Sequence, residues 1–344
     1  MKTSIQTPPT AIALAVDLLV GGNLVAFPTE TVYGLGADAR QTAAIELVYR
    51  VKGRPANNPL IVHVADIQTA RQCAGAFPPA AEILASAFWP GPLTMVLPRG
   101  PAICPAACAG LNTMAIRLPN HPIALEILGR FGHPVCAPSA NLSGQTSPTS
   151  AAHVLTELDG LIPLIVDGGS CTVGLESTVV DLTGPSPVVL RPGAITAEMI
   201  QRELLNAGFN SRVVLESPMT SADRGDAMAS PGLLARHYAP RTPAFRFART
   251  DADRVIHWLQ QQPRQSRIAL LVFPGGPIFE GIAEQMVLPA GGAACAQQLY
   301  AMLRKADEGH FDTILLEMPE LQTGVWAAII DRMTRATREL ASYA

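Results

Sequence analysis

Residues 52–63 carry the side chains with the clearest chemical use in this sequence. They read Lys-Gly-Arg-Pro-Ala-Asn-Asn-Pro-Leu-Ile-Val-His, so a basic, proline-braced loop leads into an apolar strand. Pro55 and Pro59 restrict φ and reduce the freedom that Lys52 and Arg54 would lose on binding an anion. The guanidinium of Arg54 can grip phosphate oxygens in a bidentate fork. The segment predicts a phosphate site, although a solvated basic turn would have the same composition.

Two further segments place hydroxyl groups after apolar runs. Residues 28–36 read Pro-Thr-Glu-Thr-Val-Tyr-Gly-Leu-Gly, in which Thr31 and Tyr33 could contact a small polar ligand. Taken alone, this segment is more typical of a helix N-cap followed by a helix. Residues 137–144 form a small-residue turn that suits phosphate or ribose oxygens, or an ordinary Ser/Asn-rich loop.

Two arginines stand toward the ends of apolar strands. Arg117 follows residues 114–116, where a buried charge is costly without a partner, and a ligand carboxylate would supply that partner. An arginine at the surface edge of the sheet is the competing interpretation. Arg191 also stands at the end of an apolar strand. The candidate cations are therefore Lys52, Arg54, Arg117 and Arg191, and the motifs that carry them contain few carboxylates. The sequence therefore predicts one cleft that binds a triphosphate beside an amino acid carboxylate.

Two familiar catalytic arrangements are not recognisable in the sequence. The sequence shows no Ser-His-Asp arrangement and no Gly-x-x-x-x-Gly-Lys-Ser/Thr phosphate loop. Catalysis is therefore expected to depend on positioning and electrostatics rather than on a covalent nucleophile.

Composition indicates a soluble globular protein, and the mixed pattern of apolar strands and amphipathic helices described below indicates an α/β fold. The 344 residues are 48% hydrophobic and 15% charged, and the net charge of -3 argues against broad nonspecific binding of nucleic acid. The six cysteines lack paired zinc-site spacings and are interpreted as reduced thiols. The apolar run 11–16 is too short for a membrane helix or a signal peptide, so we expect a cytoplasmic protein.

Hydrophobic periodicity predicts two domains. Strands are expected at 24–27, 59–64, 93–98, 114–118, 135–138, 164–167, 177–182 and 188–191, and helices at 10–20, 43–51, 80–88, 122–131, 150–158 and 197–205. Residues 216–229 lack an apolar period and are the best linker candidate. A smaller alternating unit follows, with helices at 251–262, 293–307 and 324–340 and strands at 267–273 and 311–317. We expect domains at 1–207 and 244–344, joined by a linker or lid at 208–243.

These motifs, taken in order, resemble the YrdC-domain family and in particular its two-domain threonylcarbamoyl-AMP synthases. The matching motifs are Pro28-Thr29-Glu30-Thr31-Val32-Tyr33-Gly34-Leu35, Lys52-x-Arg54-Pro55 with Asn58-Pro59-Leu60 and His63, Trp89-Pro90-Gly91-Pro92-Leu93-Thr94, Arg117-x-Pro119, Ser139-x-Asn141, Glu176-Ser177-Thr178, Arg191-Pro192-Gly193, Ser230-Pro231-Gly232 and His237-Tyr238-Ala239-Pro240. The resemblance implies a YrdC-like twisted mixed sheet with helices and a central basic cleft. It also implies a smaller C-terminal three-layer α/β Rossmann-like domain.

The resemblance further implies a nucleotidyltransferase that makes threonylcarbamoyl-AMP and pyrophosphate from L-threonine, bicarbonate or CO2, and ATP with Mg2+. The threonine contacts it implies are Thr31, His63, Arg117, Ala137 and Ser177. The ATP contacts it implies are Lys52, Arg54, Asn58, Thr113, Ser139, Asn141, Ser147, Arg191 and Tyr238, with Lys52 and Arg54 also stabilising charge at the α-phosphorus. The metal is expected to be held mainly by ATP phosphates.

The implied partner is a downstream tRNA threonylcarbamoyl transferase, which would use the product to make N6-threonylcarbamoyladenosine at tRNA position 37. No stable nucleic-acid or membrane binding is expected. Leu233 stands where the family would have methionine, a volume-conserving change. The C-terminal unit shows no catalytic cluster, so we expect it to support closure or assembly.

Two other functions remain open. An RNA-binding module would need aromatic stacking platforms, yet aromatic residues make up only 5% of the chain. A carbamoyltransferase acting on carbamoyl phosphate, as YrdC-like domains do in hydrogenase-maturation proteins, would carry accompanying zinc-finger or acylphosphatase-like segments that are not seen here.

Overall fold

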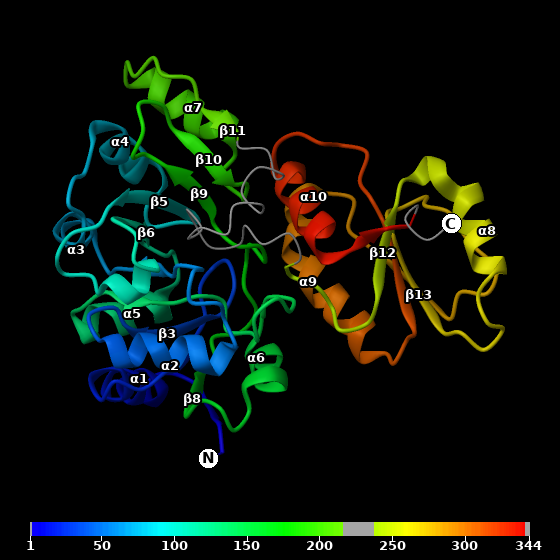
Figure 1. The fold of residues 1–344 in the computed structure, drawn as a ribbon, viewed down its shortest axis with the longest axis horizontal. Helices are drawn as coiled ribbons and strands as arrows, with labels where there is room; N and C mark the ends of the chain where they lie inside the picture. Colours follow the sequence, from blue (N-terminus) through cyan, green and yellow to red (C-terminus); the bar gives the residue numbers. More distant parts are fainter. Residues whose placement is uncertain (1, 216–236, 341–344) are drawn as a thin grey trace. The chain divides into compact units, whose positions relative to one another are not determined.

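The computed structural model describes residues 2–215 and 237–340, which divide into two compact units (Figure 1). The first unit contains most of residues 2–215. The second contains residues 237–340 together with the short segment Gly144–Thr146. The predicted linker at 216–229, the Ser230-Pro231-Gly232 motif and Leu233 lie outside the described residues.

The first unit is built on a mixed, eleven-stranded sheet in the order β1-β8-β2-β3-β7-β4-β6-β5-β9-β10-β11. Its strands are β1 (Ser4–Gln6), β2 (Val25–Phe27), β3 (Gly34–Asp38), β4 (Ile61–His63), β5 (Leu93–Pro98), β6 (Thr113–Arg117), β7 (Val135–Cys136), β8 (Leu164–Val166), β9 (Thr178–Asp181), β10 (Val188–Arg191) and β11 (Val214–Leu215). Its helices are α1 (Thr10–Val20), α2 (Thr42–Lys52), α3 (Ile67–Cys73), α4 (Pro79–Phe88), α5 (Pro122–Phe131), α6 (Ala151–Leu158) and α7 (Ala197–Asn206), with a 3-10 turn η1 (Pro105–Cys108). This confirms the predicted mixed α/β architecture.

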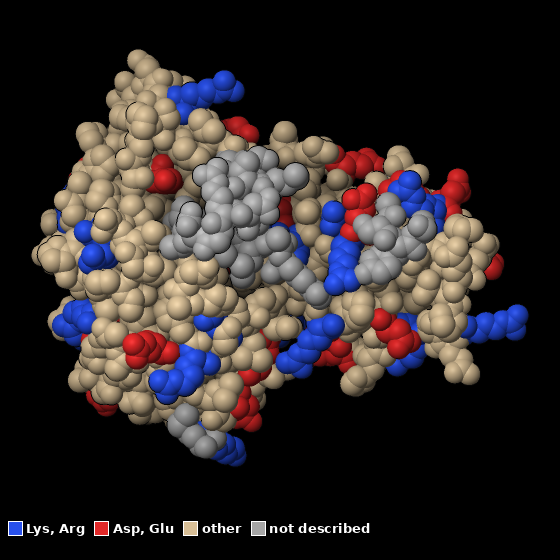
Figure 2. All heavy atoms as spheres, in the orientation of Figure 1, with Lys and Arg blue, Asp and Glu red and all other residues tan. Residues whose placement is uncertain are grey.

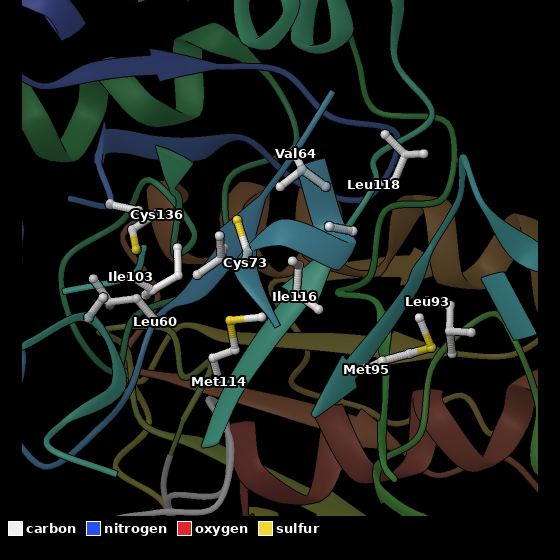
Figure 3. Packing of buried hydrophobic residues seen from close by; sticks show 14 of the residues in the cluster. Leu60, Val64, Cys73, Leu93, Met95, Ile103, Met114, Ile116, Leu118 and Cys136 are labelled. Atoms are coloured by element: carbon white, nitrogen blue, oxygen red, sulfur yellow. The ribbon is translucent and has the colours of Figure 1, made fainter. Parts of the chain in front are cut away.

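Alternation along β6 separates a packed face from a polar face. Met114 and Ile116 point into the main apolar cluster, where Figure 3 shows them beside Leu60, Met95 and other buried side chains. Because successive side chains of a strand point to opposite faces, Thr113, Ala115 and Arg117 share the other face. The polar residues of β6 therefore lie on the side away from this cluster.

A small apolar cluster identifies that other face on four further strands. It contains Ile61, Val96, Ala115, Val179 and Leu190, from β4, β5, β6, β9 and β10. We call the side of the sheet that carries these residues the site face. His63 and Thr94 stand two residues from Ile61 and Val96, so they share this face.

Gly53 determines where the basic loop begins. It adopts a left-handed conformation with φ +59°, and its N–H bonds to the carbonyl of Arg50, which ends α2 at Lys52. The N–H of Arg54 then bonds to the carbonyl of Tyr49. This turn anchors Lys52 on the helix and places Arg54 at the start of the loop that leads to β4.

The second unit has a five-stranded, wholly parallel sheet in the order β14-β13-β15-β12-β16. Its strands are β12 (Ala244–Phe247), β13 (Ile268–Val272), β14 (Glu284–Val287), β15 (Thr313–Glu317) and β16 (Arg338–Glu339), and its helices are α8 (Ala252–Gln260), α9 (Gly292–Glu308) and α10 (Val325–Ala336), after a 3-10 turn η2 (Arg249–Asp251). Figure 1 shows α8 on one side of this sheet and α9 and α10 on the other, which confirms the predicted three-layer arrangement.

Several short strands were missed by sequence reasoning. The helix-start interpretation of residues 28–36 is wrong, because Gly34–Asp38 form β3, antiparallel to β2. A Cβ on Gly36 would lie 2.6 Å from the Phe27 ring, so the close approach of the two strands requires glycine there. The strands β1, β11, β12, β14 and β16 were also missed, and β16 occupies part of the predicted helix 324–340.

Candidate active site

Arg117 lies at the carboxyl end of β6 and is 3% exposed. Its Nε donates to the carbonyl of Gly91 at 3.2 Å, and Nη1 donates to Oγ1 of Thr31 at 2.8 Å. Two segments that the sequence singled out separately are thus joined at one guanidinium. The structure thus places two of the residues that the resemblance assigned to threonine in direct contact, and their contact with threonine stays a prediction.

Glu30 is the ion-pair partner of Arg117, and sequence reasoning missed it. Its Oε1 lies 2.7 Å from Nη2 of Arg117, and both side chains are almost fully buried. The sequence analysis expected a ligand carboxylate to partner Arg117, whereas the structure shows that a carboxylate of the protein already does so. The competing interpretation of Arg117 as a surface-edge arginine is wrong, because the side chain is buried. The signal was present in the sequence, because Glu30 stands beside Thr31 in the 28–36 motif.

His63 is directly opposite Arg117 on the parallel strands β4 and β6. It is 3% exposed, and its Nδ1 lies 3.1 Å from the carbonyl oxygen of Ile61. Burial, reinforced by the positive charge of Arg117, lowers the pKa of His63 to about 3. His63 is therefore a neutral imidazole at neutral pH.

Ser177 joins Arg191 to the same region. Arg191 donates from Nε and Nη2 to the Ser177 carbonyl at 3.1 and 3.0 Å, and Nη2 lies 3.2 Å from the Ser177 hydroxyl. That hydroxyl also lies 2.7 Å from Oγ1 of Thr94 on β5. Thr94 stands three residues after Gly91, whose carbonyl accepts a hydrogen bond from Arg117. The short segment 91–94 therefore contacts Arg117 directly and Arg191 through the hydroxyl of Ser177.

Lys52 is oriented by the 137–144 turn. Its Nζ donates to the carbonyl of Ser139 at 2.6 Å and also to the carbonyl of Asn141. The side chain is 2% exposed, and burial followed by the charge of Arg54 lowers the pKa of Lys52 well below its usual value. In this structure Lys52 binds the backbone of two residues that the resemblance assigned to ATP.

Arg54 is held by its own loop. Its Nε donates to the carbonyl of Asn58 at 3.0 Å, and Nη2 donates to Oδ1 of Asn58 at 2.5 Å and to the carbonyl of Pro59 at 2.8 Å. Nδ2 of Asn58 is buried without a hydrogen-bond partner among the described residues. Arg54 and Asn58 thus form one preformed unit ahead of β4.

The remaining predicted residues of the first unit have separate positions. Ser147 donates to Oε1 of Glu176 at 2.5 Å, next to Ser177 in the chain. Ala137 follows β7, and its N–H bonds to the carbonyl of Ile61 at 2.9 Å. Thr113 lies at the opposite end of β6 from Arg117, about 13 Å away at the usual rise of a strand.

Tyr238 belongs to the second unit. It is 1% exposed, its ring stacks on Tyr300 at 5.8 Å, and Arg332 lies over the ring at 5.0 Å. Its backbone carbonyl accepts a hydrogen bond from Thr146, in the Gly144–Thr146 segment. The predicted nucleotide contact of Tyr238 stays a prediction.

The candidate cations are interior residues rather than surface charges. Lys52, Arg54, Arg117 and Arg191 are 2 to 8% exposed. On the face that Figure 2 shows, Lys and Arg lie scattered among Asp and Glu over a mostly uncharged surface. The positive charges that could meet a ligand are therefore held in place by protein oxygens before it binds.

The described residues contain neither a metal-ligand cluster nor a membrane-spanning helix. Within residues 2–215 and 237–340, no group of three or more His, Cys, Asp or Glu side chains is arranged to hold a metal ion. Across the same ranges, no helix has the length and apolar character needed to cross a bilayer.

Comparison with known proteins covers both units. A family model described as "Telomere recombination" matches residues 17–193, and one described as "Threonylcarbamoyl-AMP synthase, C-terminal domain" matches residues 195–337. A Bacillus subtilis threonylcarbamoyl-AMP synthase is 41% identical over 337 residues, covering 96% of this chain and 94% of the relative. A Pyrococcus abyssi threonylcarbamoyl-AMP synthase is 38% identical over 333 residues, covering 95% of this chain and 94% of the relative.

The fold comparison gives the same result. The crystal structure of P. abyssi Sua5 complexed with L-threonine matches with a TM-score of 0.87 and 35% identity, over 98% of this chain and 99% of that chain. Sequence motifs, both family models and the fold thus agree along nearly the whole chain. The chain belongs to the threonylcarbamoyl-AMP synthase family, in its two-domain form.

Proposed function

We propose that this chain makes threonylcarbamoyl-AMP and pyrophosphate from L-threonine, bicarbonate or CO2, and ATP. The observation that carries the proposal is the buried group of Arg117, Thr31 and His63 on the site face. Arg117 offers a cation for the threonine carboxylate, and the Thr31 and Ser177 hydroxyls offer hydrogen bonds to polar groups of threonine or its carbamate.

The nucleotide is proposed to lie along the same face. Thr113 and Arg117 share one face of β6 at opposite ends, so a ligand bound near Thr113 and an amino acid at Arg117 could lie side by side. Arg54, Asn58, Ser139, Asn141, Ser147 and Arg191 are the further residues assigned to ATP. Tyr238 is assigned to the nucleotide as part of the proposed lid, residues 208–243, which would exclude water from a labile mixed anhydride.

Catalysis is proposed to be electrostatic. Lys52 and Arg54 would stabilise the charge that develops as the carbamate attacks the α-phosphorus and pyrophosphate leaves. Their protein contacts hold them in position beforehand, so little reorganisation accompanies the reaction.

Mg2+ is proposed as the accompanying metal. The phosphate oxygens of ATP and water would supply the oxygen ligands that this ion prefers. When bound, the ion would neutralise charge on the pyrophosphate leaving group. The domains proposed for these roles are 1–207 for catalysis and 244–344 for support of closure or assembly. The product is proposed to pass to a tRNA threonylcarbamoyl transferase in the cytoplasm.

The test is pyrophosphate release by the purified chain with ATP and Mg2+. Release should depend on both L-threonine and bicarbonate. Pyrophosphate release that depends on neither L-threonine nor bicarbonate would rule out the proposed reaction.

A further inference from the structure

Glu30 and Arg117 form an ion pair that leaves hydrogen-bonding capacity unused. Their charged atoms are 2.7 Å apart, yet the contact does not have the direction of a hydrogen bond. Among the described residues, Oε1 and Oε2 of Glu30 and Nη2 of Arg117 are buried and have no hydrogen-bond partner. Glu30 is 5% exposed, so bulk water does not replace the missing partners.

Burying such a pair costs free energy, because the carboxylate loses its hydration and gains no protein hydrogen bonds in its place. The other contacts of Arg117, to Gly91 and Thr31, hold the guanidinium in place without Glu30. A ligand that donates hydrogen bonds to Glu30 and accepts them from Arg117 would satisfy the three unpartnered atoms together.

We propose that Glu30 binds the α-ammonium group of the amino acid substrate and accepts one of its protons, a role that rests on the function proposed above. A zwitterionic amino acid carries its carboxylate and ammonium on the same carbon. The adjacent guanidinium and carboxylate of Arg117 and Glu30 present the complementary charges at matching spacing. Glu30 is thus a catalytic residue in addition to Lys52 and Arg54.

The proton step follows from the chemistry of carbamate formation. An ammonium nitrogen has no lone pair and cannot attack carbon. When one N–H bond breaks and an O–H bond forms on Glu30, the electron pair stays on nitrogen and a neutral amine results. The amine then forms the N–C bond to bicarbonate, while the C–O bond to hydroxide breaks and the hydroxide leaves with a second amine proton as water.

Several titratable groups influence this step. Arg117 is the ion-pair partner of Glu30, and His63 is next to Arg117 on β4. Burial lowers the pKa of His121, at the start of α5, and the charge of Glu30 partly opposes that shift. Burial, with a smaller contribution from Glu30, raises the pKa of Cys171 to about 12, so the thiol stays protonated.

The first test compares Glu30→Gln with the wild-type chain, with Glu82→Gln as a matched control. Glu82 is a half-exposed carboxylate paired with Arg71 at 2.8 Å on the protein surface. Glu30→Gln should weaken L-threonine binding at least about tenfold by titration calorimetry, and Glu82→Gln should leave it unchanged. Thermal unfolding of both variants reports whether they fold.

A pH profile separates proton acceptance from a purely structural role. The turnover number of Glu30→Gln should fall at least about a hundredfold near neutral pH and rise toward alkaline pH, where free threonine carries a neutral amine. The Glu30→Asp variant, which keeps a carboxylate, should recover part of the loss. A uniformly reduced profile with the wild-type shape would overturn the proposal.

An amine-free analogue keeps the test valid if Glu30→Gln does not fold. The probe is 2,3-dihydroxybutanoate, in which a hydroxyl replaces the ammonium group. Wild-type protein should bind it at least about tenfold more weakly than threonine, and Glu30→Gln, where folded, should not weaken it further. Equal wild-type affinity for both ligands would overturn the role of Glu30. A wild-type chain that fails to bind threonine at all would instead overturn the proposed function.

Discussion

His63 and Arg117 lie opposite one another on the parallel strands β4 and β6, both buried, with the imidazole beside a permanent positive charge. This arrangement lowers the pKa of His63 to about 3, chiefly through burial. The folded chain therefore keeps His63 neutral over a pH range in which the unfolded chain protonates it.

The first prediction concerns stability in acid. Between about pH 6.5 and 3 the unfolded state binds a proton at His63 that the folded state does not, so this residue should reduce stability as pH falls. The slope from one such group is at most about 1.4 kcal/mol per pH unit. His63→Gln should remove this part of the slope in denaturant titrations. The control variant His257→Gln, at an exposed position on α8, should keep the same dependence of stability on pH as the wild-type chain.

The second prediction concerns Lys52. Because burial lowers its pKa, a bound polyphosphate should favour the charged form and draw a proton from solvent. Calorimetry of ATP binding in two buffers with different ionisation enthalpies should reveal net proton uptake that increases toward alkaline pH, where more of the unliganded lysine is neutral. Lys52→Met should bind ATP at least about tenfold more weakly and lose that uptake. The same uptake in the variant would show that another group titrates.

The third prediction separates the two ligands. Arg117→Ala should weaken L-threonine binding far more than ATP binding, and Arg54→Ala should do the reverse, each by at least about tenfold for its own ligand. Arg117→Ala should also lower the free energy of unfolding by about 3 to 5 kcal/mol, because Glu30 would stay buried without its partner. Equal losses of both ligands in both variants would contradict the assignment of the two subsites.

The fourth prediction uses two glycines. A Cβ on Gly91 would collide with the backbone carbonyl of Phe88, in the loop whose Gly91 carbonyl accepts a bond from Arg117. Gly91→Ala should therefore destabilise the fold by about 1 to 3 kcal/mol and weaken threonine binding. Gly129, on α5, has open space around its Cβ position, so Gly129→Ala should stabilise by about 0.5 to 1 kcal/mol. A destabilised Gly129→Ala would contradict this reading of the two positions.

The longer elements could be predicted because their sequences repeat at a clear period. The helices predicted at 10–20 and 122–131 were found at those residues, since apolar spacing and flanking glycines or prolines agree. The strand β3 could not be found this way, because Gly-Leu-Gly-Ala-Asp has neither a β-branched residue nor an alternating pattern. Its place depends on the Phe27 ring packing against Gly36, a tertiary contact.

The candidate site was predicted as a set of residues but not as a set of contacts. The bond between Thr31 and Arg117 joins segments 86 residues apart, and the sequence only suggested that both are polar positions after strands. Glu30 was overlooked because its place beside Thr31 in the 28–36 motif marks a polar position but does not identify Arg117 as its partner. Burial of Lys52 likewise depends on where the 137–144 turn passes, which no local pattern specifies.

Mass spectrometry of the reaction product tests the central claim most directly. The purified chain would be incubated with ATP, Mg2+, L-threonine and bicarbonate labelled with carbon-13. The expected product is an adenylate that contains threonine and retains the labelled carbon. An adenylate of threonine without the labelled carbon, or no threonine-dependent adenylate at all, would contradict it.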